Sequence, residues 1–179
     1  MLRRDYSAAK KALQTSSASE LSYTTAGTTP KTFFEGCIYL AQGDHLNAQK
    51  AFELGRPAFE AAVQEAPASG DRHAILGWLY AFMGRKEDAI REGRRAVELK
   101  PESKDAVDGT LMSAYLALIY ARVGENDLAI PLIDRLLKTP GAVDSADYSI
   151  TINDLKHRWE WDPLRSDPRF QKLLTQSSP

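Results

Sequence analysis

Apolar and polar positions follow the same arrangement in three stretches of the chain. In each stretch a tyrosine lies within an apolar segment, a glycine follows four residues later, and an alanine lies five residues further on, in a more charged segment. The residues are Tyr39, Gly43 and Ala48, then Tyr80, Gly84 and Ala89, then Tyr120, Gly124 and Ala129. Equivalent residues are 41 and 40 positions apart, so the pattern predicts a repeated structural unit.

Each unit predicts a pair of antiparallel helices. In the second unit, residues 74–84 are apolar, and residues 85–101 are charged with a helical period. Leu76 and Tyr80 are four residues apart and therefore share one face of a helix. Gly84 suits the left-handed conformation that ends a helix, and the proline that closes the second range ends the next helix.

The second unit resembles the tetratricopeptide repeat, a family of stacked helix pairs. The matching residues are His73, Leu76, Gly77, Tyr80, Ala89, Ala96 and Pro101 in the second unit, Leu116, Ala117, Tyr120, Ala129 and Ile133 in the third, and Gly36, Tyr39, Ala48 and Phe52 in the first. The resemblance implies an all-α, tetratricopeptide-type superhelix, which is a solenoid of antiparallel helix pairs with a C-terminal capping helix.

We expect one domain over residues 1–179. Its expected parts are a remnant helix of a truncated repeat at 1–13, a loop at 14–31, repeats at 32–66, 70–103 and 110–141, and a C-terminal cap at 142–179. The units are spaced more widely than the ~34 residues of this family, so insertions are expected.

Three insertions or irregularities are predicted within the repeats. Gly55 and Pro57 predict a kink in a long second helix of the first repeat, from about residue 47 to about residue 65. Residues 102–110 are polar and predict an extended loop. Pro131 predicts a disturbance at the start of the third repeat's second helix.

The tail of the chain contains two Asp-Pro steps, at Asp162 and Asp167. In each step the aspartate can cap a helix whose first residue is the proline. The apolar residues of the tail predict an inner face that covers the last repeat, made of Trp159, Trp161, Leu164, Phe170, Leu173 and Leu174. This ending resembles the tail of tetratricopeptide arrays in bacterial signalling and regulatory proteins, which implies a module of a larger protein of that kind.

Composition excludes several classes of function. The formal net charge of the 179 residues is -1, so neither a nucleic-acid partner nor a membrane partner is expected. The chain has no apolar run near the ~20 residues that span a bilayer, and no recognisable signal peptide. Cysteine occurs once, as Cys37, which excludes an internal disulfide and favours a reducing, cytoplasmic location.

The sequence also lacks a recognisable catalytic constellation. His45, His73 and His157 are scattered over the chain without the spacing of metal ligands. Neither a glycine-rich phosphate loop nor a calcium loop is present. Arginines between residues 85 and 95 alternate with acidic residues, as is typical of a solvated helix face. We therefore expect no enzyme activity, no metal site and no cofactor.

The candidate site is the apolar side of the first helices. Residues 74–84 and 111–121 contain no charged residue, and a helix that is apolar all round needs cover on both sides. In a tetratricopeptide superhelix one of these sides faces the concave groove. The candidate groove residues are Phe33, Cys37, Leu40, Trp78, Phe82, Leu118 and Arg122, with Trp78 and Phe82 at the centre.

Two functions fit this surface. The first is a non-catalytic protein–protein interaction module, a scaffold whose apolar concave groove binds a peptide or helix of a partner. The alternative is structural self-association as a homodimer, or docking within a larger bacterial signalling protein. Neighbouring repeats or the chain's own tail could also cover the groove, and the sequence leaves these alternatives open. Trp78→Ala distinguishes them, because it removes partner binding from a groove but unfolds a core.

Overall fold

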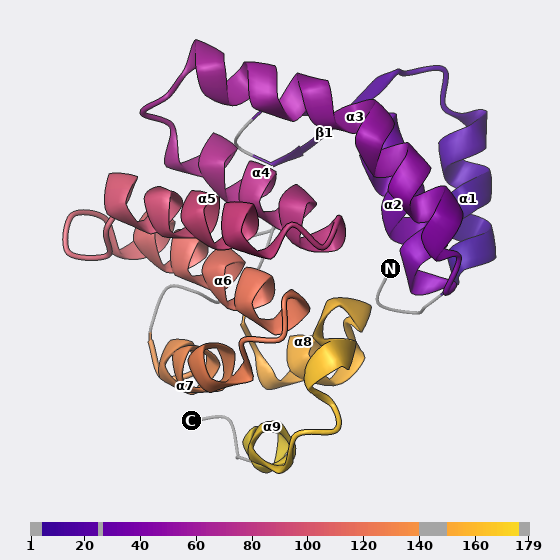
Figure 1. Ribbon diagram of the computed structural model, residues 1–179. Coiled ribbons are helices and arrows are strands. Elements are labelled where there is room, and N and C mark those ends of the chain that lie inside the picture. Colours follow the sequence, from indigo (N-terminus) through magenta and orange to yellow (C-terminus); the bar gives the residue numbers. More distant parts are fainter. Residues whose placement is uncertain (1–4, 25–26, 140–149, 176–179) are drawn as a thin grey trace.

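Helices make up nearly all of the structure, a computed structural model that describes residues 5–24, 27–139 and 150–175 (Figure 1). The elements are α1 (Tyr6–Thr15), β1 (Glu20–Thr24), β2 (Gly27–Pro30), α2 (Lys31–Ala41), α3 (His45–Glu65), α4 (Gly70–Phe82), α5 (Lys86–Leu99), α6 (Ala106–Arg122), α7 (Asn126–Leu136), α8 (Ile152–His157), the 3-10 helix η1 (Trp159–Leu164) and α9 (Pro168–Leu174). The predicted all-α class is confirmed.

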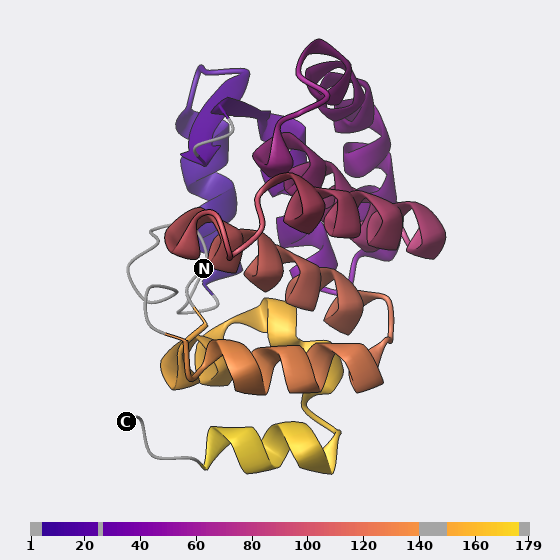
Figure 2. The same cartoon turned by 90° about the vertical axis from the view of Figure 1, so that its left-hand side faces the viewer.

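Consecutive helices pack as pairs, and the pairs stack. α2 packs on α3, α4 on α5, and α6 on α7. Between pairs, α4 packs on α3, and α6 packs on both α4 and α5. Figure 2 shows the pairs one below another, with the tail at the bottom. This arrangement is that of a tetratricopeptide-type superhelix.

The same glycine turn joins the two helices of each pair. Gly43, Gly84 and Gly124 have φ angles of 80°, 74° and 80°. These values are left-handed, a conformation that glycine adopts without a steric cost. The first residue after each glycine donates its N–H to the carbonyl of the unit's tyrosine at 2.9 Å: Asp44 to Tyr39, Arg85 to Tyr80, and Glu125 to Tyr120. The predicted role of the repeated glycine is therefore confirmed.

Glycine also allows the close approach of helices within a pair. A Cβ atom added to Gly77 on α4 would lie 2.9 Å from the backbone N of Gly93 on α5. One added to Gly36 on α2 would lie 2.4 Å from the ring of Phe52 on α3. Since real Cβ contacts are longer, both helix pairs depend on the missing side chain.

Both helices that contain an internal proline are continuous. α3 runs through Pro57, and in Figure 1 it bends about halfway along its length. α7 runs through Pro131 without interruption, so the expected disturbance at its start is absent. The carbonyl of Asp127, which the N–H at position 131 would normally reach, belongs to an exposed residue, where water can replace the missing donor.

The loop expected at 14–31 is wrong in part, because it contains a β-hairpin. β1 pairs antiparallel with β2, with Leu21 opposite Thr29. The hydroxyl of Thr28 donates to Glu20 Oε2 at 2.6 Å, and Thr29 is buried. A run of threonines suits a strand, since β-branched side chains pack well on a pleated surface. The sequence interpretation gave too much weight to their polarity.

The extended loop expected at 102–110 is also too long, because α6 begins at Ala106. Asp105 caps the helix, accepting hydrogen bonds from the backbone N–H groups of Val107 and Asp108 at 2.9 Å each. The chain before the cap folds tightly onto α6, and a Cβ atom on Gly109 would lie 2.5 Å from Glu102 Cα. An N-cap worth about 1 kcal/mol thus extends the helix into the polar segment.

The tail packs on the last repeat as three short elements. η1 packs against α6, and α9 packs against α7 and α8. Asp167 caps α9 as predicted, with a proline at the first turn. The other predicted cap is wrong, because Pro163 lies inside η1 rather than at its start. Residues 1–4 of the expected remnant helix, 140–141 of the expected third repeat, and 142–149 and 176–179 of the expected cap lie outside the described residues.

Candidate interaction surface

The candidate surface is built on α4 and α6, the first helices of the second and third repeats. Every residue of α4 from His73 to Phe82 is buried, as is every residue of α6 from Gly109 to Ala121. The cover that an all-round apolar helix needs is therefore present on each side of both helices. It comes from the neighbouring pairs and from the tail.

Aromatic rings join the helices on this side of the molecule. Phe33 on α2 lies 5.4 Å from the ring of Trp78 and 6.1 Å from that of Phe82, both on α4. The rings of Trp78 and Phe82 are 4.9 Å apart, and Tyr115 on α6 lies 5.9 Å from Trp78. Ring pairs at such distances attract each other beyond simple burial. Three first helices thus share one aromatic interior.

The chain's own tail covers this interior. Trp159 in η1 stacks on the ring of Phe82, with centroids 5.6 Å apart and an interplanar angle of 18°. Phe52 on α3 stacks on the same ring at 5.5 Å. Phe82 is therefore held by both the first repeat and the tail. In the structure the neighbouring repeats and the tail cover the expected groove, which was one of the alternatives that the sequence left open.

The seven candidate groove residues are brought together, but six of them are interior. Phe33, Cys37, Leu40, Trp78, Phe82 and Leu118 are all buried, and all belong to one hydrophobic core. Trp78, which was expected at the centre of a binding surface, is only 3% exposed. Arg122 alone is half-buried. Its side chain keeps access to the surface, and the partner-binding role of the set stays a prediction.

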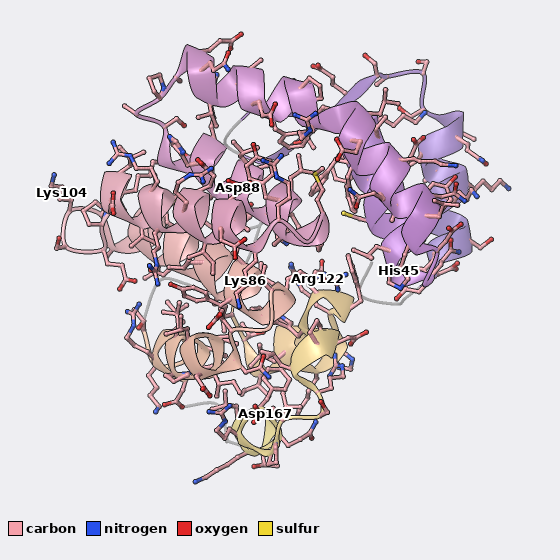
Figure 3. All side chains as sticks on the ribbon, in the orientation of Figure 1. His45, Lys86, Asp88, Lys104, Arg122 and Asp167 are labelled. Carbon is pink, nitrogen blue, oxygen red and sulfur yellow. The ribbon has the colours of Figure 1, made fainter. Side chains whose placement is uncertain are left out.

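Arg122 is the last residue of α6 and lies beside the tail (Figure 3). Its guanidinium carbon is 5.6 Å from the centroid of the Phe82 ring, within cation–π distance. Burial lowers the pKa of Arg122, and interaction with Cys37 opposes that effect. Among the residues that the structure describes, no acidic group forms an ion pair with it.

Cys37 and Glu160 lie in the same interior. The pKa of the Cys37 thiol is raised well above its usual value, first by burial and then by Glu160, while Arg122 opposes the shift. A thiol in this state is a poor nucleophile, so Cys37 is a packing residue. Burial also raises the pKa of Glu160.

Two buried indoles and one carboxylate oxygen in η1 lack hydrogen-bond partners within the described part of the chain. They are Trp159 Nε1, Trp161 Nε1 and Glu160 Oε2. An unsatisfied buried polar atom costs about 1–3 kcal/mol. The tail therefore covers the aromatic interior with good apolar packing but with poor polar satisfaction.

The scattered histidines do not meet. His73 is buried, with Nδ1 2.6 Å from Glu92 Oε2 and Nε2 3.1 Å from the carbonyl oxygen of Pro67. These contacts fix α4 against α5 and the preceding turn. Across residues 5–24, 27–139 and 150–175, no three potential ligands gather as a metal site. In the same residues no helix combines the length and apolar character needed to cross a bilayer.

A second surface, between α5 and the start of α7, was not singled out by sequence. It is an open cleft of about 690 Å³, lined in part by Ile90, Arg94 and Leu128. The Leu128 side chain is 41% exposed. Arg94 donates to the hydroxyl of Tyr120 at 3.1 Å, which ties the cleft to the third repeat. The signal that could have revealed it was the exposed leucine at the start of a helix.

A family model described as tetratricopeptide repeat matches residues 72–103. The match covers α4 from its third residue, the following turn and all of α5. No curated protein and no solved structure matches the chain.

Proposed function

Starting from the tetratricopeptide repeat at residues 72–103, we propose that this chain is a non-catalytic module that binds another protein. Such repeats are protein–protein interaction elements, and their stacked helices form extended binding surfaces. The observation that carries the proposal is the match itself, which falls on the central helix pair. The pairs on either side repeat its glycine turn, which gives three pairs in one stack.

The proposed surface is the concave side at the end of α6, around Arg122. The apolar part of the candidate groove is interior, because Phe82 already packs on Phe52 and Trp159. Arg122 is the member of the candidate set that solvent reaches. A partner segment would therefore contact Arg122 and the rim of η1. The alternative is that a second copy of the chain, or another part of a larger protein, takes this place.

The cleft between α5 and α7 is the second candidate surface. Its volume of about 690 Å³ is in the range of ligand pockets, and Ile90 and Leu128 give it an apolar floor. Arginine side chains along its edge, which are often important at interfaces, include Arg94. This surface would receive an amphipathic helix.

Photo-crosslinking in the native host distinguishes the two surfaces. p-Benzoylphenylalanine is introduced at Val123, next to Arg122, or at Leu128 in the cleft, and the adducts are identified by mass spectrometry. We expect one discrete heterologous adduct from position 123 and none from position 128. An adduct only from position 128 would move the function to the cleft. An adduct with a second copy would favour self-association, and no adduct at either position would contradict the binding module.

A further inference from the structure

Arg122 differs from every other arginine that the structure describes. The others donate to a carboxylate, apart from Arg94, which donates to the hydroxyl of Tyr120. The paired arginines are Arg56, Arg72, Arg85, Arg91, Arg95, Arg135, Arg158, Arg165 and Arg169. Arg122 has neither kind of partner within the described residues, although it is less exposed than several arginines that do.

The surroundings of Arg122 make this lack of a partner costly. Placing a guanidinium in an apolar environment without an anion costs free energy. Burial accordingly lowers the pKa of Arg122. The face of the Phe82 ring, 5.6 Å away, offsets part of the cost, but a cation–π contact does not supply the missing anion. The site therefore holds a positive charge that no acidic side chain in the described part of the chain neutralises.

A second donor beside the same ring also lacks an acceptor. Trp159 stacks on Phe82, is 4% exposed, and has an indole Nε1 without a hydrogen-bond partner in the described residues. The neighbouring acid does not correct the balance. Glu160 forms no ion pair with Arg122 among the described residues, and burial raises its pKa, which favours the uncharged carboxyl. Two donor groups beside Phe82, the guanidinium of Arg122 and the indole of Trp159, therefore lack an acceptor among the described residues.

We propose that Arg122 anchors a carboxylate of the protein partner, the side chain of an aspartate or glutamate within an otherwise apolar segment. The inference rests on the proposed function, and it names the chemistry of the partner. A guanidinium presents a planar fork that binds a carboxylate through two parallel hydrogen bonds. The aromatic neighbours Phe82 and Trp159 favour apolar residues on either side of that acid.

The test uses two labelled 12-residue peptides of leucine, alanine and serine, one with a single central glutamate and the other with glutamine there. Binding to the full chain is measured by fluorescence anisotropy. We expect the glutamate peptide to bind at least about tenfold more tightly, since a hydrogen bond to a charged group is worth about 1.5–3 kcal/mol. Arg122→Gln should abolish this preference, and Arg122→Lys should keep part of it. Arg95→Gln is the matched control and should bind like the native chain.

Stability measurements separate an anchor from a structural arginine. If Arg122 is an anchor for a ligand, Arg122→Gln removes a charge that has no partner among the described residues. The melting temperature of this variant should then equal or exceed that of the native chain. A melting temperature lowered by several degrees would overturn the proposal, because Arg122 would then hold the fold together.

Four binding results would also overturn the proposal. Equal affinity for the two peptides would show that the site does not recognise a carboxylate. A preference for the glutamate peptide that Arg122→Gln leaves unchanged would show that Arg122 does not bind it. Stronger competition by inorganic phosphate than by acetate would reassign the site to phosphate. Binding of neither peptide would refute the anchor as well. None of these results decides whether the chain binds a protein, because crosslinking from position 123 tests that separately.

Discussion

α1 and the tail lie at opposite ends of the row of helices in Figure 1, and they are attached in different ways. α1 has ten residues and buries none of its side chains. It lies on α2, where Lys10 is 5.0 Å from the ring of Tyr39. The tail is built from shorter elements but buries six large side chains, namely Leu155, Trp159, Trp161, Leu164, Phe170 and Leu173.

The length of a helix in this molecule therefore does not indicate how many side chains it buries in the core. A six-residue 3-10 helix that inserts two tryptophans contributes more to the fold than a complete α-helix lying on the surface. The reason is that burial of apolar area, not helix formation, supplies most of the stability of a helix in a protein. The tail belongs to the core, and α1 is attached to it from outside.

Deleting each end should give the largest contrast. Removal of residues 158–179 should lower the melting temperature steeply or cause aggregation. Each lost side chain contributes about 1.5–3 kcal/mol, and a domain has only about 5–15 kcal/mol in total. Removal of residues 1–15 is the control and should change the melting temperature by a few degrees at most. Circular dichroism melts and size-exclusion chromatography measure both. Equal changes in melting temperature for the two deletions would show that α1 and the tail contribute equally to stability.

Substitution of a ring in the aromatic interior tests how far the core extends. Trp78→Ala should cost about 3–5 kcal/mol of unfolding free energy, as expected for a large buried aromatic residue. Leu54→Ala on α3 should change it by less than about 0.5 kcal/mol, because Leu54 is 73% exposed. Urea denaturation gives both values. A small loss of unfolding free energy for Trp78→Ala would contradict a core role and favour a binding role for this residue.

Single residues at each end sharpen the contrast further. Trp161 is 1% exposed, and Trp161→Leu should cost about 1–3 kcal/mol through the cavity that it leaves. Leu13 on α1 is half-buried, and Leu13→Ala should cost less than Trp161→Leu in the same urea titration. A larger cost for the α1 variant would show that α1 is held more firmly than its burial indicates.

Acid should loosen α9, which is the smallest effect expected here. The pKa of Asp167 is lowered to about 2, mainly by its hydrogen bonds with Arg169. Ionised Asp167 therefore stabilises the folded state fully above its usual pKa near 4, and this contribution is lost as the pH falls towards 2. Tryptophan fluorescence between pH 5 and pH 2 should show a transition that Asp167→Asn weakens. An identical titration for that variant would show that Asp167 does not cause the transition.

The repeated helix pairs could be predicted because their signals are local. Tyr80, Gly84 and Ala89 lie within ten residues of one another, and the turn that they specify is closed by hydrogen bonds of the same segment. The inner face of the tail was predicted in the same way. The hairpin was missed because threonine is both polar and β-branched, and only its pairing decides which property matters.

The candidate site was predicted only in part, because its state depends on contacts distant in sequence. Periodicity places Phe82 and Trp78 on one side of α4, but it cannot show that Trp159 stacks on Phe82. Arg122 was identified as a groove residue by its position in the repeat. That it has no ion-pair partner among the described residues follows only from the positions of the acidic side chains in the structure.

The burial of α4 from His73 to Phe82, and of α6 from Gly109 to Ala121, determines how their amide hydrogens exchange with deuterium. In α1, fraying of a few residues is enough to open each hydrogen bond to water. Between His73 and Phe82, however, the helix is enclosed by its neighbours on all sides, so its amides open only when the helices around it separate. Exchange there follows global unfolding rather than local opening. The slowest amides of α4 thus report the free energy of unfolding of the whole stack, including the tail.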